Sequence, residues 1–204
     1  MMKKIAIIGV NNQDRMVLTQ ALSYITGYGI VSKADYSIQS IRYGINKALE
    51  YAGKHDLFIY LFASFSERIV IEQHYDQYVS NGSVLHELAT VRAFFNRQTA
   101  NRRKSGEWAS MLDGAGKIIT EYANRQYDCF IYLDSGLEKE DTPSNDIDTC
   151  MKNLIAEQEH IYRIRKDSIL SDILEEISMD MKIRPVISSK TALERAQENM
   201  LKQL

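Results

Sequence analysis

Cysteine and proline are scarce in this sequence, and its net charge is small. Two cysteines, Cys129 and Cys150, are too few for a disulfide framework and lack the spacing of a metal site. Two prolines and ten glycines in 204 residues, with 45% hydrophobic residues, exclude a disordered chain. The formal charge of -2 excludes a generally basic surface for nucleic acid or an anionic membrane.

Long hydrophobic runs are also missing. The apolar run behind Lys3 and Lys4 ends at residue 8, which is too short for a signal peptide or a membrane span. The four histidines are scattered along the chain, so no metal site is expected. We therefore expect a cytoplasmic protein without membrane or nucleic-acid partners, in which the two cysteines stay reduced.

What the sequence does contain is an alternation of strand-length apolar runs and helical patterns, which predicts an α/β fold. We expect a mainly parallel sheet of about five strands with helices on both faces, in three layers. The expected strands are 4–8, 30–32, 57–63, 78–80 and 129–133, with 161–164 as a further candidate. The expected helices are 15–26, 37–52, 66–75, 84–95, 106–124, 145–158, 168–181 and 189–204. Residues 1–184 would form the domain, and 185–204 a C-terminal helical extension.

The first strand ends at Gly9, where a phosphate-binding loop would carry Gly, four residues and then Gly-Lys-Ser/Thr. Here the three closing positions are Asp14, Arg15 and Met16. Asp14 replaces the glycine that lets backbone approach phosphate, and Met16 has no hydroxyl for magnesium, whereas Arg15 retains a positive charge. The candidate cofactor-binding residues are Gly9, Asn11, Asn12, Gln13, Asp14, Arg15 and Met16. Any α/β protein that opens with a strand, a glycine turn and a helix would have a similar segment.

A second informative segment spans 78–89, where a short strand leads into Asn81, Gly82 and Ser83 and then a helix that Ser83 would cap. It follows the segment 67–73 and precedes the strand 128–134 with its acidic loop. In this order of pieces the chain resembles, over about residues 3–180, the P-loop kinase-like ATPases. These include the ribosylnicotinamide kinase type and related small nucleoside and nucleotide kinases.

The resemblance implies site residues as well as a fold. Relatives typically carry an aspartate at the position of Asn81, which is implied to help with the acceptor hydroxyl or the metal; an asparagine can do neither. Arginines of a lid are implied to neutralise the transferring phosphate, and Arg97, Arg102 and Arg103 occupy a suitable stretch. The candidate catalytic residues are therefore Arg15, Asn81, Arg102 and Arg103.

Purely structural explanations also exist for these positions. Asn81 and Gly82 also form a favoured turn pair, while the basic stretch 96–104 and the acidic stretch 138–148 are typical of solvated surfaces. ATP or another nucleotide is the implied cofactor, and the altered positions disfavour magnesium.

The leading hypothesis is a protein of P-loop kinase-like fold, with a degenerate loop, that binds a nucleotide or phosphorylated metabolite. Its phosphoryl transfer would be weak or absent, and Asp134 or Asp35 would have to replace the missing metal ligand. The alternative is a non-catalytic interaction or regulatory module that uses no nucleotide, and a third hypothesis is an unrelated α/β enzyme. The C-terminal helix would pack on the domain or pair with a second copy.

Overall fold

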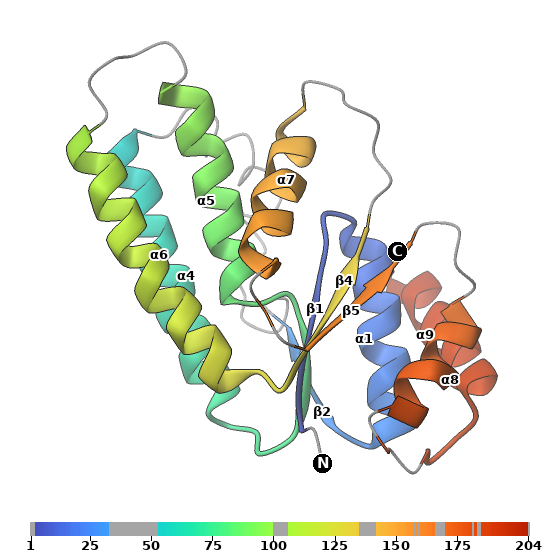
Figure 1. The fold of residues 1–204 in the computed structure, drawn as a ribbon. Helices are drawn as coiled ribbons and strands as arrows, with labels where there is room; N and C mark the ends of the chain where they lie inside the picture. Colours follow the sequence, from blue (N-terminus) through green and yellow to red (C-terminus); the bar gives the residue numbers. More distant parts are fainter. Residues whose placement is uncertain are drawn as a thin grey trace.

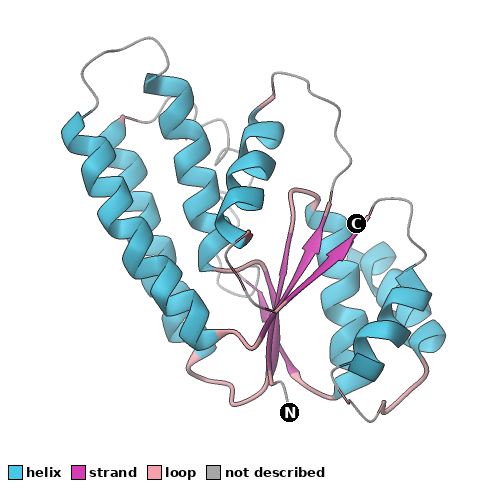
Figure 2. Cartoon of the chain, viewed as in Figure 1, coloured by secondary structure: helices cyan, strands magenta, loops and turns pink. Residues whose placement is uncertain are grey.

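Five parallel strands form a single sheet in the computed structural model of this chain (Figure 2). The structure describes residues 3–32, 53–99, 106–134, 142–156, 158, 160–165, 170–180, 182 and 185–203. The strands are β1 (Lys4–Ile8), β2 (Gly29–Ser32), β3 (Tyr78–Asn81), β4 (Cys129–Leu133) and β5 (Ile161–Ile164). Their order is β2-β3-β1-β4-β5, and every neighbouring pair is parallel. The expected parallel sheet is thus confirmed, with β1 at its centre.

Helices cover both faces of the sheet, which confirms the three-layer architecture (Figure 1). α1, α8 and α9 lie on one face, and α4, α5, α6 and α7 lie on the other. Their bounds are α1 (Asn12–Thr26), α4 (Lys54–Glu72), α5 (Val84–Thr99), α6 (Gly106–Gln126), α7 (Pro143–Ile155), α8 (Leu170–Asp180) and α9 (Ser189–Gln203).

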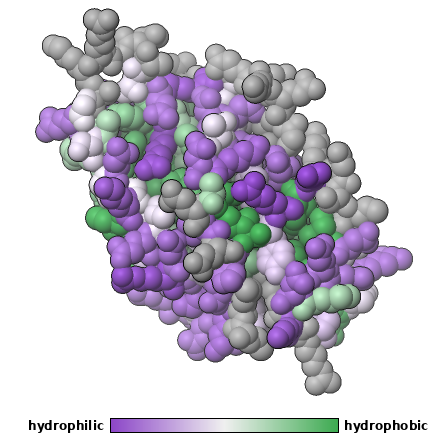
Figure 3. All heavy atoms as spheres, viewed as in Figure 1, coloured by the Kyte–Doolittle hydropathy of each residue, from purple (hydrophilic) through white to green (hydrophobic). Residues whose placement is uncertain are grey.

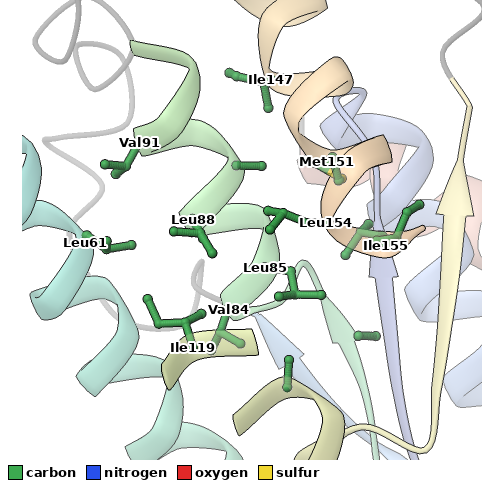
Figure 4. Packing of buried hydrophobic residues seen from close by; sticks show 14 of the residues in the cluster. Leu61, Val84, Leu85, Leu88, Val91, Ile119, Ile147, Met151, Leu154 and Ile155 are labelled. Carbon is green, nitrogen blue, oxygen red and sulfur yellow. The ribbon is translucent and has the colours of Figure 1, made fainter. Parts of the chain in front are cut away.

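The strands divide the core because successive side chains point to opposite faces. Ile5 and Ile7 belong to the cluster with α1, α8 and α9, whereas Ala6 and Ile8 belong to the cluster with α4 to α7. Figure 4 shows part of the second cluster, where aliphatic side chains of α4, α5, α6 and α7 meet. All of these β1 residues are fully buried, so both faces of the central strand are apolar, as parallel sheets require.

The expected strand at 57–63 is wrong, because these residues lie within the helix α4. A continuous apolar run of this length fits a buried strand or a helix equally well. The buried positions Leu57, Leu61, Ser64 and Arg68 instead follow helical spacing, and Ile59 between them is exposed. The fifth strand is β5, which the sequence suggested only as an addition.

The first helix begins at Asn12, three residues before the expected start, and ends at the expected glycine, Gly27, which adopts a left-handed φ of 73°. The C-terminal helix α9 packs on α1, and the Asn199 amide donates to the Tyr24 hydroxyl at 2.5 Å. The expected helix at 37–52 lies outside the described residues. No helix in the described part of the chain is long and apolar enough to cross a membrane.

Candidate functional site

The carboxyl edge of the sheet gathers Gly9 after β1, Asn81 at the end of β3 and Asp134 after β4. Open α/β sheets bind their ligands at this edge. Gly9 has a φ of 149°, and a Cβ atom built on it would lie 2.8 Å from the Leu133 carbonyl oxygen. Only glycine therefore lets the first loop pass so close to β4.

The turn between β1 and α1 contains only residues 9–11, and Asn11 caps the helix. The Asn11 side-chain oxygen accepts from the backbone N–H groups of Gln13 at 3.0 Å and of Asp14 at 3.3 Å. The Asn11 amide in turn donates to the Asp14 carboxylate at 2.6 Å. Two helix N-terminal amides that could bind an anion are thus occupied by the chain's own side chain.

Arg15 turns into the protein from the first turn of α1, and its side chain is only 7% exposed. Its Nε donates to the Asn81 side-chain oxygen at 3.1 Å and its Nη2 to the Asn12 side-chain oxygen at 2.9 Å, while Nη1 donates to the Gly9 carbonyl. Desolvation by burial lowers the pKa of Arg15 to about 10, partly offset by the nearby Glu87. Each guanidinium nitrogen therefore already donates to a protein oxygen.

The remaining predicted positions are only partly brought to this edge. The Met16 sulfur accepts from the Asn12 amide at 3.5 Å, and its side chain packs against the apolar cluster around α1. Arg97 forms an ion pair with Asp146 of α7. Arg102 and Arg103 lie outside the described residues, so their assignment stays a prediction.

A buried charged cluster behind the strand ends was missed by sequence reasoning. Arg68 of α4 is only 2% exposed; its Nη1 donates to the Ser80 hydroxyl at 2.8 Å and its Nη2 to the Asn81 carbonyl at 3.5 Å. It also lies 3.9 Å from a Glu72 carboxylate oxygen and 3.6 Å from one of Glu87. We call Arg68, Glu72 and Glu87, with the tyrosines that bind them, the Arg68 cluster.

Tyrosine hydroxyls complete this cluster. Tyr60 donates to Glu87 at 3.0 Å, while Tyr127 and Tyr122 donate to the two Glu72 oxygens at 2.5 and 3.2 Å. Burial raises the pKa of Glu72, which the charge of Arg68 and the tyrosine hydrogen bonds partly counteract. Burial by itself would lower the pKa of Arg68. Electrostatic attraction to Tyr127, Glu87 and Glu72 outweighs this effect, so the pKa of Arg68 is raised.

The sequence signals for this cluster were weak. Arg68 and Glu72 stand four residues apart within the helix expected at 66–75, as helical ion pairs do, but nothing in the sequence indicated that this pair would be buried against Glu87 and the strand ends. Gly82 is the clearer sequence sign of a crowded site behind the strand ends. In the structure its φ is 92°, and a Cβ atom built on it would lie 3.2 Å from Arg68 Nη2. Ser83 follows and caps α5 as expected, accepting from the His86 N–H at 3.3 Å.

Asn81 joins the two arginines, since its side chain binds Arg15 and its carbonyl binds Arg68. The sequence-predicted residues Gly9, Asn12, Arg15 and Asn81 therefore meet in one place. They meet as a network among themselves, in which the Asn81 oxygen already accepts a hydrogen bond from Arg15.

A second charged group lies beside β4. The Lys152 ammonium of α7 is 3.2 Å from an Asp134 oxygen and 3.0 Å from an Asp148 oxygen, and Tyr132 donates to the other Asp148 oxygen at 2.5 Å. Desolvation opposes the charge of Lys152, but its hydrogen bonds to Asp148 and Asp134 raise its pKa. Within the described residues no group of three His, Cys, Asp or Glu side chains could hold a metal ion. The carboxylate suggested for a metal thus contacts a lysine.

A cavity of about 440 Å³ lies elsewhere, between α5, α6 and α7. Its lining includes Arg92, Lys117 and Asn153. Asn153 stands near the end of α7, which returns the chain to the amino end of β5, so the cavity is not at the carboxyl edge of the sheet.

No protein-family model matches this chain, and no curated protein matches it in sequence. Among solved structures, it is similar to deoxyadenosine kinase from M. mycoides with bound dCTP. The TM-score is 0.61 at 12% sequence identity, over 88% of this chain and 98% of the kinase. At this identity the likeness concerns the fold alone, so the protein has the fold of a P-loop nucleoside kinase.

Proposed function

We propose that this protein binds a nucleotide or a related phosphorylated metabolite at the carboxyl edge of the sheet, with little or no phosphoryl transfer. The observation that carries the proposal is the inward position of Arg15, whose three guanidinium nitrogens donate to Gly9, Asn12 and Asn81. The positive charge remains at the end of β1, but no nitrogen of the guanidinium is uncommitted.

Phosphoryl transfer depends on positioning and on neutralising the charge of the transferring group. Three of the five Arg15 N–H groups donate to Gly9, Asn12 and Asn81, so a phosphate could be bound only by the second N–H groups of Nη1 and Nη2 unless Arg15 gives up one of these partners. Met16 supplies no hydroxyl for magnesium, and the Asn81 amide cannot act as a base. Weak phosphate binding without efficient transfer is the chemistry that these groups support.

Ligand binding at this edge is supported by the Arg68 cluster. Burying one arginine and two glutamates is costly, and well-packed apolar residues often replace such groups without loss of stability. The cluster lies directly behind Asn81, where a ligand at the strand ends would contact the protein. We infer that it positions Asn81 for such a ligand.

A second candidate is the non-catalytic interaction or regulatory module without nucleotide. It is favoured by the Asn11 cap, which occupies the amides of Gln13 and Asp14, and by the Asp14 carboxylate beside them. Both features oppose an anionic ligand at the helix N-terminus.

Thermal shift with ATP, ADP and deoxynucleotides, with and without magnesium, separates the two candidates, because a ligand of the folded state raises the melting temperature. The nucleotide-binding proposal expects a small, magnesium-independent rise that grows in Asp14→Gly. Absence of any shift in both proteins would favour the module, and tight magnesium-dependent ATP binding would contradict both.

Catalysis is tested with a panel of nucleoside and nucleotide kinase assays on the unaltered protein and on the double variant Met16→Ser, Asn81→Asp. Little or no turnover is expected from the unaltered chain, and any residual turnover should be lost in Arg15→Ala. Robust turnover that survives Arg15→Ala would overturn the proposal and move the active site elsewhere.

A further inference from the structure

The cavity of about 440 Å³ in the helix layer has the size of a ligand site, since pockets that bind small molecules have volumes of about 300–1,000 Å³. α5 packs against both α6 and α7, and the cavity lies between these helices (Figure 1). Figure 3, in the same view, shows a mainly hydrophilic surface over the helices of this layer, with smaller hydrophobic patches. We call the cavity the α6/α7 groove; its polar lining includes Arg92 of α5, Lys117, Thr120 and Asn124 of α6, and Asn153 of α7.

Hydrogen-bond donors line both walls of this groove. Lys117, Thr120 and Asn124 are spaced by three and four residues, which places them on one side of α6. Asn153 lines the groove from α7. The ammonium, the hydroxyl and the two amides can all donate hydrogen bonds to a ligand.

The charge around the groove is positive overall. Arg92 and Lys117 contribute two cations to the lining. Glu121 also lines the groove, but it forms an ion pair with Arg125 on the same helix, which balances its charge. Arg92 lies 3.8 Å from Asp113, whose carboxylate is 74% exposed. This distance is too long for a hydrogen bond, so the ion pair leaves the guanidinium N–H groups able to donate to a ligand.

Gly116 is what allows Arg92 to lie in the groove. A Cβ atom built on Gly116 would collide with the Arg92 guanidinium, so only glycine leaves room for it there. Glycine in the middle of a helix is less favourable than alanine, because it loses more backbone freedom on folding. The position of Arg92 therefore comes at a cost in helix stability that a purely structural role of α6 does not require.

The groove is separate from the candidate site at the carboxyl edge of the sheet. α5 begins at Val84, close to that site, and Arg92 stands about 12 Å further along the helix at 1.5 Å per residue. A ligand in the groove would thus contact other residues than one bound at Gly9, Arg15 and Asn81.

We propose that the α6/α7 groove binds a phosphate monoester with a hydroxylated body, such as a sugar phosphate, as a second ligand site. Arg92 and Lys117 bind the phosphate, because two cations match a group that carries nearly two negative charges at neutral pH. Thr120, Asn124 and Asn153 bind the hydroxyl groups of the body, which can donate and accept hydrogen bonds.

The first experiment is titration calorimetry of the full chain with ribose 5-phosphate, ribose and ribonate as probes. Ribose 5-phosphate should bind, and ribose should not. Ribonate should bind more weakly than ribose 5-phosphate, because a carboxylate carries one charge where a phosphate monoester carries nearly two. Absence of binding by ribose 5-phosphate, or equal affinity for either of the other probes, would overturn the proposal.

Gly116→Ala and Gly114→Ala form a matched pair that locates the site. Both add a methyl group to α6, but the Cβ of position 114 meets nothing, whereas that of position 116 meets Arg92. The long Arg92 side chain can move aside, so Gly116→Ala should not lower the melting temperature, while the Kd for ribose 5-phosphate should rise about tenfold or more. Gly114→Ala should leave the Kd unchanged. A Kd that is also unchanged in Gly116→Ala would place the ligand elsewhere, for instance at the carboxyl edge, and would refute the proposal.

The charge of Lys117 is tested in the same way. Lys117→Gln should raise the Kd about threefold or more, because one of the two cations is lost. Lys202→Gln removes the charge of an exposed lysine on α9 and should have no effect. Equal effects of the two substitutions would show that the phosphate responds only to the net charge of the protein, which would contradict a site in the groove.

Cys150 provides a readout inside the groove. It lies one turn before Leu154 of the lining on α7, and the charge of Arg92 lowers the pKa of its thiol against the raising effect of burial. A bound phosphate neutralises Arg92, so saturating ribose 5-phosphate should slow the alkylation of Cys150 by iodoacetamide severalfold. This protection should be absent in Gly116→Ala. Undiminished alkylation of the saturated unaltered protein would overturn the assignment of the ligand to the groove.

Discussion

Replacing Arg68 by methionine is the sharpest test of the buried charges behind the strand ends. The arginine is almost fully buried between Glu72 and Glu87, which are buried as well. Arg68→Met keeps most of the side-chain volume and removes the charge. It also removes the hydrogen bond to Ser80, which contributes about 1 kcal/mol.

The larger effect comes from the two carboxylates that lose their partner. Breaking a buried ion pair by removing one side costs about 3–5 kcal/mol, because the remaining charge stays uncompensated in a medium of low polarity. Glu72 keeps its tyrosine hydrogen bonds, which cannot replace the positive charge. We therefore expect the free energy of unfolding at neutral pH to fall by about 3–5 kcal/mol.

The loss should depend on pH in a defined direction. Burial already raises the pKa of Glu72 above 4.5, and the charge of Arg68 is the largest of the influences that counteract this, so the variant raises the pKa further. When the pKa of an acid is higher in the folded than in the unfolded protein, the acid stabilises the fold at pH values below its pKa in the unfolded protein. This stabilisation is lost as the pH rises through the pKa in the folded protein. The destabilisation by Arg68→Met should therefore shrink as the pH falls toward 4.5.

The assay is urea unfolding of both proteins at neutral and mildly acidic pH, at one protein concentration so that any association is held constant. Arg195→Met, on the exposed side of α9, is the control and should change stability by less than about 0.5 kcal/mol. The triple variant Arg68→Met, Glu72→Gln, Glu87→Gln should recover most of the loss, because no charge stays buried. A loss below about 1 kcal/mol in Arg68→Met, or one that grows on acidification, would refute the reasoning.

Three further predictions concern stability and reactivity. Gly82→Ala should lower the free energy of unfolding by about 1–3 kcal/mol, since φ is 92° there and the new Cβ would crowd Arg68; an unchanged melting curve would contradict this. Lys152→Met should lower the free energy of unfolding by up to about 1 kcal/mol at neutral pH, because Lys152 is half exposed. In urea unfolding this difference should vanish as the pH rises above 10.5, since a raised pKa stabilises the fold only while the amine is protonated. Cys150 should react with Ellman's reagent in the folded protein, whereas Cys129 should react only on unfolding. The reason is that Cys129 is fully buried and that burial raises the pKa of its thiol to about 12. Two thiols that react equally fast would contradict this.

The fold class and much of the loop architecture could be predicted from the sequence. Short apolar runs that alternate with helical patterns predict a parallel sheet, because such strands are buried on both faces. Gly9 and Gly27 marked the ends of a strand and a helix, since glycine supplies backbone conformations that other residues avoid. The meeting of Gly9, Arg15 and Asn81 at one edge also followed, because the carboxyl ends of parallel strands share an edge.

The sequence alone determined which groups are available at that edge: a positive charge at position 15, no hydroxyl at 16 and no carboxylate at 81. The tertiary structure decided how these groups are used. Whether 57–63 is a strand or a helix depended on what packs against it, because its own apolar pattern fits both. The direction of Arg15 depended on the Asn81 oxygen that β3 brings to it from 66 residues away. Side-chain rotamers and ion pairs of this kind depend on partners that are distant in the sequence. For this reason only the tertiary structure shows that Arg15 binds other residues of the protein.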